Sequence, residues 1–192
     1  MKIGIYGGTF NPIHTGHIRI AEAFLNQEGL DEVWLMVSPQ NPFKVGKDLL
    51  DDERRLQWVR KSVMGHKGLV ACDYEFSLPK PSYTWHTLQQ LSKDFPTAQF
   101  TLLIGGDNWK SFHLWRNHDE ILANYRIVIF PRKGDEIGKN ALPNNVRLLK
   151  SEMINISSTD IRESIKTGKS IHGMVAENIE EEVKEVYAKG RF

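Results

Sequence analysis

The segment Met1–Ile20, MKIGIYGGTFNPIHTGHIRI, decides the fold of this chain. Its apolar run Ile3–Tyr6 is rich in β-forming residues and stops at Gly7-Gly8, which predicts a buried strand followed by a tight turn. Apolar residues then recur at helical spacing over Ile18–Leu25, so we expect a helix that begins near Gly16. A helix start after a glycine turn presents backbone N–H groups and the positive end of the helix dipole, and both favour an anion at the turn.

Two histidines, His14 and His17, lie on either side of Gly16 in this segment. If His17 lies in the first helical turn, both imidazoles face the same side of the loop, and Gly16 adds no side chain that would keep a ligand off the backbone. Two imidazoles beside helix N–H groups suit a polyphosphate whose charge grows in a transition state. Unrelated surface histidines, or half of a metal site, are the alternative interpretations. A structural zinc site usually needs four ligands, and with Cys72 as the single cysteine the sequence predicts no metal-binding residues.

The composition is that of an ordinary globular chain, with 192 residues, 40% hydrophobic and 26% charged, and a formal net charge of +1. This length predicts a single domain over residues 1–192. Neither the charge nor any apolar run suggests a nucleic acid or a membrane as a partner. The single cysteine and the lack of a signal-peptide pattern predict a cytoplasmic protein, while the sequence leaves the oligomeric state open.

Strand-like and helix-like segments alternate along the chain. After the first strand, the predicted strands are 32–37, 69–72, 99–104, 126–130 and 146–149, and the predicted helices are about 16–28, 51–64, 82–94, a short one around 120–122 and two in a C-terminal portion of about 157–190. Such alternation predicts a Rossmann-like α/β fold, an open parallel sheet with helices on both faces. Ligands of such sheets bind at the carboxyl ends of strands near the switch point, and the first and fourth strands both end in glycines.

A second candidate motif is NISSTDIR, Asn155–Arg162. Ser157 or Ser158 is a good N-cap residue, with Asp160 in the first turn, so one interpretation is simply a well-capped helix. The other is a phosphate site, because the segment offers three hydroxyls and a helix start, and Arg162 lies one turn further in with a guanidinium that can bind phosphate oxygens.

GGTFNPIHTGH (7–17) and ISSTDIR (156–162) together resemble two motifs of the HxGH nucleotidyltransferase superfamily, whose members transfer a nucleotidyl group from a nucleoside triphosphate. The resemblance implies an ATP site in which the second motif holds the β- and γ-phosphates. Asn11 stands where members commonly carry Asp, so this chain keeps a side-chain acceptor there without the charge. The implied ATP-binding residues are Gly7, Gly8, Thr9, Phe10, His14, Gly16, His17, Gly105, Asp107, Ile156, Ser157, Ser158, Thr159 and Arg162.

The middle of the chain offers candidates for a second substrate. PSYTWHTL (81–88) starts a helix with several donors and with aromatic side chains that include Trp85, and IGGD (104–107) ends a strand with a carboxylate. Trp115 follows, and an exposed indole stacks well on a flat ligand, although tryptophans are more often packing residues. Lys44 lies in a long loop after the second strand, where it is either a phosphate contact or only solvated charge.

These segments resemble the bacterial nicotinate-nucleotide adenylyltransferase family over essentially the whole chain. The resemblance implies that Thr84 and Trp115 hold a pyridine ring, that Asp107 lies near the sugar, and that Lys44 holds the phosphate of a mononucleotide. The loop reads NPFK at 41–44 where the family's pattern is PPHK, so Asn41 and Phe43 depart from it, and Arg132 is a candidate for the missing phosphate contact. The predicted acceptor-binding residues are Lys44, Thr84, Trp85, Asp107, Trp115 and Arg132.

The predicted reaction is adenylyl transfer from ATP to nicotinate mononucleotide, which gives nicotinate adenine dinucleotide and pyrophosphate in NAD biosynthesis. The acceptor phosphate is already ionised and needs no general base, so His14, His17 and Arg162 are expected to act by positioning and charge stabilisation. Mg2+ is expected on the triphosphate, largely hydrated, because the sequence has no carboxylate cluster. The alternatives are nicotinamide mononucleotide or phosphopantetheine as the acceptor, and a non-catalytic nucleotide sensor, which Asn11 and Phe43 would favour.

Overall fold

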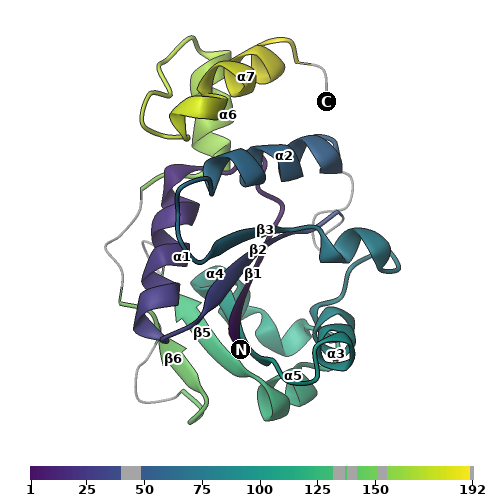
Figure 1. Cartoon of the computed structure of the whole chain (residues 1–192). Coiled ribbons are helices and arrows are strands. Elements are labelled where there is room, and N and C mark those ends of the chain that lie inside the picture. The colour runs from purple at the N-terminus through teal and green to yellow at the C-terminus, as the bar shows by residue number, and fades with distance from the viewer. Residues whose placement is uncertain (40–48, 132–136, 138–141, 151–154, 191–192) are drawn as a thin grey trace.

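A sheet of six parallel strands forms the centre of the computed structural model of this chain (Figure 1). The strand order is β3-β2-β1-β4-β5-β6, so the direction in which the sheet grows reverses between β1 and β4. The strands are β1 Lys2–Gly8, β2 Glu32–Val37, β3 Leu69–Cys72, β4 Gln99–Gly105, β5 Arg126–Phe130 and β6 Val146–Leu148. The structure describes residues 1–39, 49–131, 137, 142–150 and 155–190.

Helices cover both faces of this sheet (Figure 1). One apolar cluster joins the sheet to α1 Thr15–Gln27, α2 Asp52–Ser62, α6 Ser158–Lys166 and α7 Glu177–Ala188. The other joins it to α3 Thr84–Asp94, α4 Gly106–Lys110, α5 His118–Asn124 and the 3₁₀ turns η2 Tyr74–Ser77 and η3 Phe112–Leu114. The predicted Rossmann-like sheet with helices on both faces is therefore confirmed.

The two clusters are separated by the alternation of side chains along each strand. In β1, Ile3 and Ile5 belong to the cluster under α3, whereas Tyr6 belongs to the cluster under α1. β5 repeats the pattern, with Ile127 and Ile129 on the α3 side and Val128 on the α1 side. Each central strand is thus apolar on both faces, which is why these strands read as continuous apolar runs in the sequence.

The predicted elements agree closely with the observed ones, and one helix start differs in detail. The helix expected to be capped within Ser82–Thr84 begins at Thr84, with Tyr83 at the N-cap position and no side-chain cap hydrogen bond. A phenol has no short acceptor that could reach the first N–H groups of the helix. Ser82 is instead buried and lines the cavity described below, so its hydroxyl does not cap the helix.

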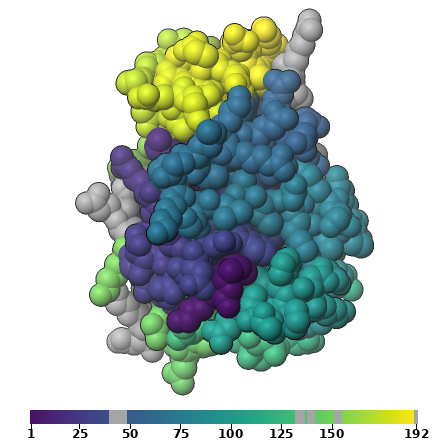
Figure 2. All heavy atoms as spheres, viewed as in Figure 1, coloured from purple at the N-terminus to yellow at the C-terminus, as the bar shows by residue number. Residues whose placement is uncertain are grey.

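The C-terminal helices α6 and α7 pack at one end of the molecule, next to α2 (Figures 1 and 2). Trp58 of α2 donates from Nε1 to Oε2 of Glu182 at 3.1 Å, and Asn178 donates to the Lys61 carbonyl at 2.9 Å. Thr15, at the start of α1, donates its N–H to the Met174 carbonyl at 2.9 Å. None of the helices in the described ranges combines the length and apolar character that a bilayer span needs.

Candidate active site

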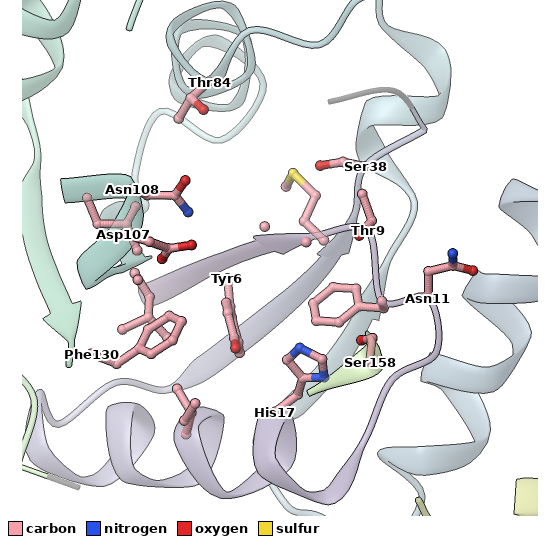
Figure 3. A pocket seen from close by; sticks show the side chains of 18 of the residues that line it. Tyr6, Thr9, Asn11, His17, Ser38, Thr84, Asp107, Asn108, Phe130 and Ser158 are labelled. Carbon is pink, nitrogen blue, oxygen red and sulfur yellow. The ribbon is translucent and has the colours of Figure 1, made fainter. Parts of the chain in front are cut away.

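A cavity of about 1010 Å³ opens at the carboxyl ends of β1 and β4, at the point where the strand order reverses (Figure 3). Open α/β sheets bind ligands at this position. Figure 3 shows His17 and Ser158 at one end of the cavity and Thr84 of α3 at the other. The cavity therefore brings together segments that lie far apart in the sequence.

His14 and His17 stack face to face, with ring centroids 3.6 Å apart and ring planes 25° apart. His14 holds the N-cap position of α1, and its backbone N–H donates to Nδ1 of His17 at 3.2 Å. The edge of Phe10 closes the other side of the His17 ring, with centroids 5.0 Å apart. Both imidazoles line the cavity, so they do lie on the same side of the loop.

The second motif is joined directly to the first. The guanidinium of Arg162 donates to the Asn11 carbonyl at 2.6 Å and to Oγ1 of Thr159 at 3.2 Å, and the Ser158 hydroxyl donates to the Pro12 carbonyl at 2.8 Å. The two bonds to the Asn11 and Pro12 carbonyls dock the start of α6 onto the loop after β1, and the bond to Thr159 orients the guanidinium within α6. A phosphate bound between the motifs would therefore meet a preassembled surface.

Ser157 is the N-cap of α6 and forms a capping box with Asp160. The backbone N–H of Asp160 donates to Oγ of Ser157 at 3.1 Å, and its carboxylate accepts from the Ser157 N–H, also at 3.1 Å. The hydroxyls of Ser157, Ser158 and Thr159 all have partners within the protein. The donors that this motif offers to the cavity are therefore the uncapped N–H groups in the first turn of α6 and the guanidinium of Arg162.

The side chain of Asn11 points away from His17 and Thr9 in Figure 3. It is buried, and its Oδ1 accepts hydrogen bonds from the Tyr187 phenol at 2.6 Å and from the Leu50 N–H at 3.3 Å. Burial raises the pKa of Tyr187, so the phenol stays protonated and able to donate. The Tyr187 phenol and the Leu50 N–H each need only an acceptor, so the amide oxygen of Asn11 can accept both hydrogen bonds as well as an Asp carboxylate would.

The opposite end of the cavity contains Thr84, Tyr83 and Trp115. The indole of Trp115 is half-buried, and its Nε1 atom has no hydrogen-bond partner within the described residues. Arg116 places its guanidinium over the Tyr83 ring, 5.2 Å from the centroid, and both line the cavity. This end therefore offers aromatic surface, a helix start and one permanent cation, which suits a flat anionic ligand.

Most of the predicted site residues line this one cavity. From the ATP set these are Gly7, Gly8, Thr9, Phe10, His14, His17, Gly105, Asp107, Ile156, Ser157, Ser158, Thr159 and Arg162, and from the acceptor set Thr84, Asp107 and Trp115. Gly16 is buried in the first turn of α1 and is not among the lining residues. Lys44 and Arg132, like Asn41 and Phe43, lie outside the described residues.

The placement of Trp85 differs from its prediction as an acceptor contact. Its side chain is 8% exposed and belongs to the apolar cluster with Leu88 and Phe112, and it does not line the cavity. Position explains the difference, because Thr84 and Trp85 are consecutive residues at a helix start and therefore point in different directions. Thr87, three residues after Thr84, shares its helix face and does line the cavity.

Arg55 of α2 is fully buried, and it was not predicted from the sequence. Its guanidinium pairs with Asp52 and donates to three carbonyls, those of Leu50, Thr9 and Ser38, at 2.8, 2.5 and 3.1 Å. Burial lowers the pKa of Arg55, and the ion pair with Asp52 opposes that change. This side chain ties the loop after β1 to the end of β2. The sequence did contain a signal for the burial of Arg55. It lies four residues before the buried Val59, so the two share one face of the helix.

Glu75 was also missed, and no sequence signal identified it. It lines the cavity, is 6% exposed, and accepts a 2.9 Å hydrogen bond from Oγ1 of Thr87. Burial raises the pKa of its carboxyl, and nearby hydroxyls of Ser38, Thr87 and Ser82 oppose that rise.

As to metals, the described residues contain no group of three or more His, Cys, Asp or Glu side chains placed to hold an ion.

Residues 5–164 match the cytidylyltransferase-like family. A Bacteroides fragilis protein named probable nicotinate-nucleotide adenylyltransferase is 47% identical over 170 residues, which cover 88% of this chain and 85% of the relative. A protein of the same name from Bacteroides thetaiotaomicron is 41% identical over 185 residues, which cover 96% of this chain and 92% of the relative.

Solved structures show the same fold. A Vibrio parahaemolyticus protein, described as a candidate nicotinate-nucleotide adenylyltransferase, has a TM-score of 0.72 at 26% identity and covers 97% of each chain. Plasmodium falciparum nicotinic acid mononucleotide adenylyltransferase, complexed with NaAD, has a TM-score of 0.83 at 18% identity over 96% of this chain and 95% of that chain. At that identity the second likeness is one of fold.

Proposed function

The chain belongs to the cytidylyltransferase-like family, and on that basis we propose that it transfers the adenylyl group of ATP to nicotinate mononucleotide in NAD biosynthesis. The products are nicotinate adenine dinucleotide and pyrophosphate. One observation carries the proposal: a single cavity contains both nucleotidyltransferase motifs at one end and Thr84 with Trp115 at the other. The names of the curated relatives agree with it.

ATP occupies the end of the cavity between α1 and α6. The helix starts and the guanidinium of Arg162 provide N–H donors for the β- and γ-phosphates, and they are fixed in place before ATP arrives. His14 and His17 lie across the loop from these donors and contact the reacting phosphates, with His17 nearest to the α-phosphate. The stack on His14 and the edge of Phe10 hold the His17 ring in one orientation.

Nicotinate mononucleotide occupies the end near α3. Its pyridine ring stacks on the indole of Trp115, and its carboxylate meets the N–H groups at the start of α3, beside Thr84. Arg116 adds positive charge at the rim. An anionic ring substituent suits this set of donors better than a neutral amide does.

The acceptor phosphate attacks the α-phosphorus of ATP in line with the leaving group. A bond forms between an acceptor phosphate oxygen and the α-phosphorus, the bond from the α-phosphorus to the bridging oxygen breaks, and pyrophosphate leaves with that electron pair. The nucleophile is already ionised, so the protein contributes positioning and charge stabilisation. Arg162 and the start of α6 stabilise the charge that develops on the leaving pyrophosphate.

Mg2+ accompanies ATP in this proposal. Triphosphate oxygens and water supply most of its ligands, because Mg2+ usually keeps several waters and binds through substrate phosphates. The donor set of the cavity fits this arrangement, since the residues around the phosphate end are mainly N–H donors and imidazoles rather than a cluster of carboxylates. The ion supplies further neutralisation of phosphate charge.

Pyrophosphate release, measured with ATP and Mg2+ and one acceptor at a time, tests the function. Nicotinate mononucleotide should be used in clear preference to nicotinamide mononucleotide and phosphopantetheine. Preference for the amide would keep the chemistry but contradict the account of the carboxylate at α3. A folded chain that binds ATP but releases no pyrophosphate with any of the three would contradict the proposed function and favour a nucleotide sensor.

A further inference from the structure

A buried group of polar side chains lies in the cavity wall next to α3. Glu75 of η2, Ser82 before α3, Thr87 within α3 and Ser38 after β2 all line the cavity. Glu75 and Ser82 are 6% and 8% exposed, and Thr87 is 2% exposed. Four separate segments thus meet through side-chain oxygens, at a place that the proposed reaction does not use.

Oε1 of Glu75 accepts a hydrogen bond from Thr87. Oε2 of Glu75 and Oγ of Ser82 have no hydrogen bond of good geometry in the part of the chain that the structure describes, although the Ser38 and Ser82 hydroxyls lie near enough to Glu75 to favour its charged form. Buried polar atoms are rarely left unpaired, because each one costs free energy. This polar cluster is therefore a feature of the cavity wall that packing alone does not favour.

The charges around Glu75 do not favour its ionised form. No Lys, Arg or His of the described residues forms an ion pair with it, and burial raises its pKa. On β3 the Cys72 thiol, whose pKa burial raises to about 11, is uncharged, and the neighbouring Asp73 pairs with Arg60 at 3.0 Å. On the α3 side the first turn contains no acidic residue, and Arg116 lies over Tyr83 at the rim.

Glu75 is connected to the acceptor position through α3. Thr84 and Thr87 are three residues apart, so they share one face of the helix, and both line the cavity. The hydrogen bond from Thr87, the fourth residue of α3, places the Glu75 carboxyl against the first turn of this helix. A negative charge there would repel an anion bound at the N–H groups of the same helix start.

We propose that Glu75 is a positioning residue of the acceptor site, whose buried carboxyl fixes the start of α3 through Thr87 and thereby governs how well the pocket holds an acceptor with an anionic ring substituent. The proposal rests on the proposed function and adds a residue that governs acid-over-amide selectivity. Ionisation of Glu75 weakens binding of the acid and leaves binding of the amide nearly unchanged. Selectivity thus depends on pH through a group that touches neither substrate.

The test is the ratio of kcat/KM for nicotinate mononucleotide to that for nicotinamide mononucleotide, measured from about pH 6 to about pH 9. The two acceptors carry the same phosphate, so the effect of phosphate ionisation on kcat/KM cancels in the ratio. In the unmodified chain the ratio should fall by about tenfold as the pH rises. In Glu75→Gln, which keeps the shape and an acceptor for Thr87 but cannot ionise, it should stay within about twofold of its value at low pH.

A matched pair of serine variants gives a second test that does not depend on the folding of Glu75→Gln. Ser82 and Ser62 are both buried serines whose hydroxyls lack partners among the described residues, but only Ser82 lines the cavity. The Ser82 hydroxyl opposes the rise in the pKa of Glu75. Ser82→Ala should therefore move the fall in selectivity to higher pH, and Ser62→Ala should leave it in place.

Three results would overturn the proposal. The first is a kcat/KM ratio that does not change with pH in the unmodified chain. The second is a dependence of that ratio on pH that is the same in Glu75→Gln as in the unmodified chain. Equal shifts in the two serine variants would show a general effect on stability rather than an effect on Glu75. If neither acceptor supports pyrophosphate release, the proposed function fails and this proposal fails with it, whereas turnover with a constant ratio removes only the role of Glu75.

Discussion

The phenol of Tyr187 in α7 donates a 2.6 Å hydrogen bond to Oδ1 of Asn11 in the loop after β1. Both side chains are buried, with exposed fractions of 1% and 6%. The carbonyl of Asn11 also accepts from Arg162 of α6. The loop that carries the first motif is therefore held from both C-terminal helices, and its conformation depends on residues at the far end of the chain.

Tyr187→Phe should lower the free energy of unfolding by about 1 kcal/mol, because Asn11 loses a buried hydrogen bond. It should also lower kcat, since the same bond fixes the loop beside His14. Urea unfolding and steady-state pyrophosphate release measure the two effects. The matched control is Tyr125→Phe, which removes a 2.9 Å hydrogen bond to Ser92 at an exposed position and should leave kcat unchanged. Equal loss of kcat in both variants would contradict the prediction.

His17→Ala should reduce kcat by about 10²- to 10³-fold while leaving the thermal unfolding midpoint within a few degrees. The ring lines the cavity and is half-buried, so its loss removes charge stabilisation at the reacting phosphate more than it removes core packing. Pyrophosphate release gives kcat, and calorimetry gives the midpoint. His113→Ala, an exposed histidine outside the cavity, is the control and should behave like the unmodified chain. An unchanged rate in His17→Ala would remove His17 from the mechanism.

Arg55→Met should cost about 3–5 kcal/mol of stability, because three buried carbonyls and the carboxylate of Asp52 lose their donor at once. Urea unfolding measures this loss, and Arg54→Met is the matched control. Arg54 is the exposed neighbour in α2, so its replacement should change stability by less than about 0.5 kcal/mol. A small effect in Arg55→Met would show that water replaces the lost bonds.

Glu75→Gln should change how stability depends on pH. Burial raises the pKa of Glu75, so above the ordinary glutamate pKa the folded chain retains a proton that the unfolded chain has lost. The contribution to stability is full below that ordinary value and is lost as the pH rises toward the folded-state pKa. The stability of the variant relative to the unmodified chain should therefore increase with pH, by about 1.4 kcal/mol for each pH unit in this window.

Urea unfolding at a series of pH values measures this slope. Glu180→Gln is a useful comparison, because a hydrogen bond with Lys184 lowers the pKa of Glu180. That contribution is present above the ordinary glutamate pKa and is lost as the pH falls, so the relative stability of Glu180→Gln should change with pH in the opposite direction. Parallel slopes in the two glutamine variants would contradict the assignment for Glu75.

The architecture was predictable because its signals are local. The runs that became β1, β2 and β5 are apolar on both faces, and the helices between them repeat at helical spacing, so the order of elements follows from neighbouring residues alone. The two motifs are also local strings, and their positions after β1 and at the start of α6 place them at the same edge of the sheet. The part of the candidate site that was predicted is therefore the part that lies within these local motifs.

The errors have a different origin. Trp85 was assigned to the acceptor site as one of the aromatic side chains at a helix start, but the direction of a side chain there depends on the packing of that helix. Glu75 was missed because nothing near it in the sequence shows that it is buried, and Arg55 was missed because its spacing from Val59 is a weak signal for a charged side chain. The structural role of the Asn11 amide was also not predictable, since its partner Tyr187 is distant in the sequence.

Local sequence signals were sufficient to predict the parallel sheet, the helices on both faces, and the position of the two motifs at the carboxyl ends of the strands. Only the tertiary structure decided which buried polar groups meet: Tyr187 with Asn11, Arg55 with Thr9 and Ser38, and Glu75 with Thr87. The physical reason is that periodicity and turn chemistry act between near neighbours, whereas a buried polar group must find its partner wherever the packing of the whole chain places one.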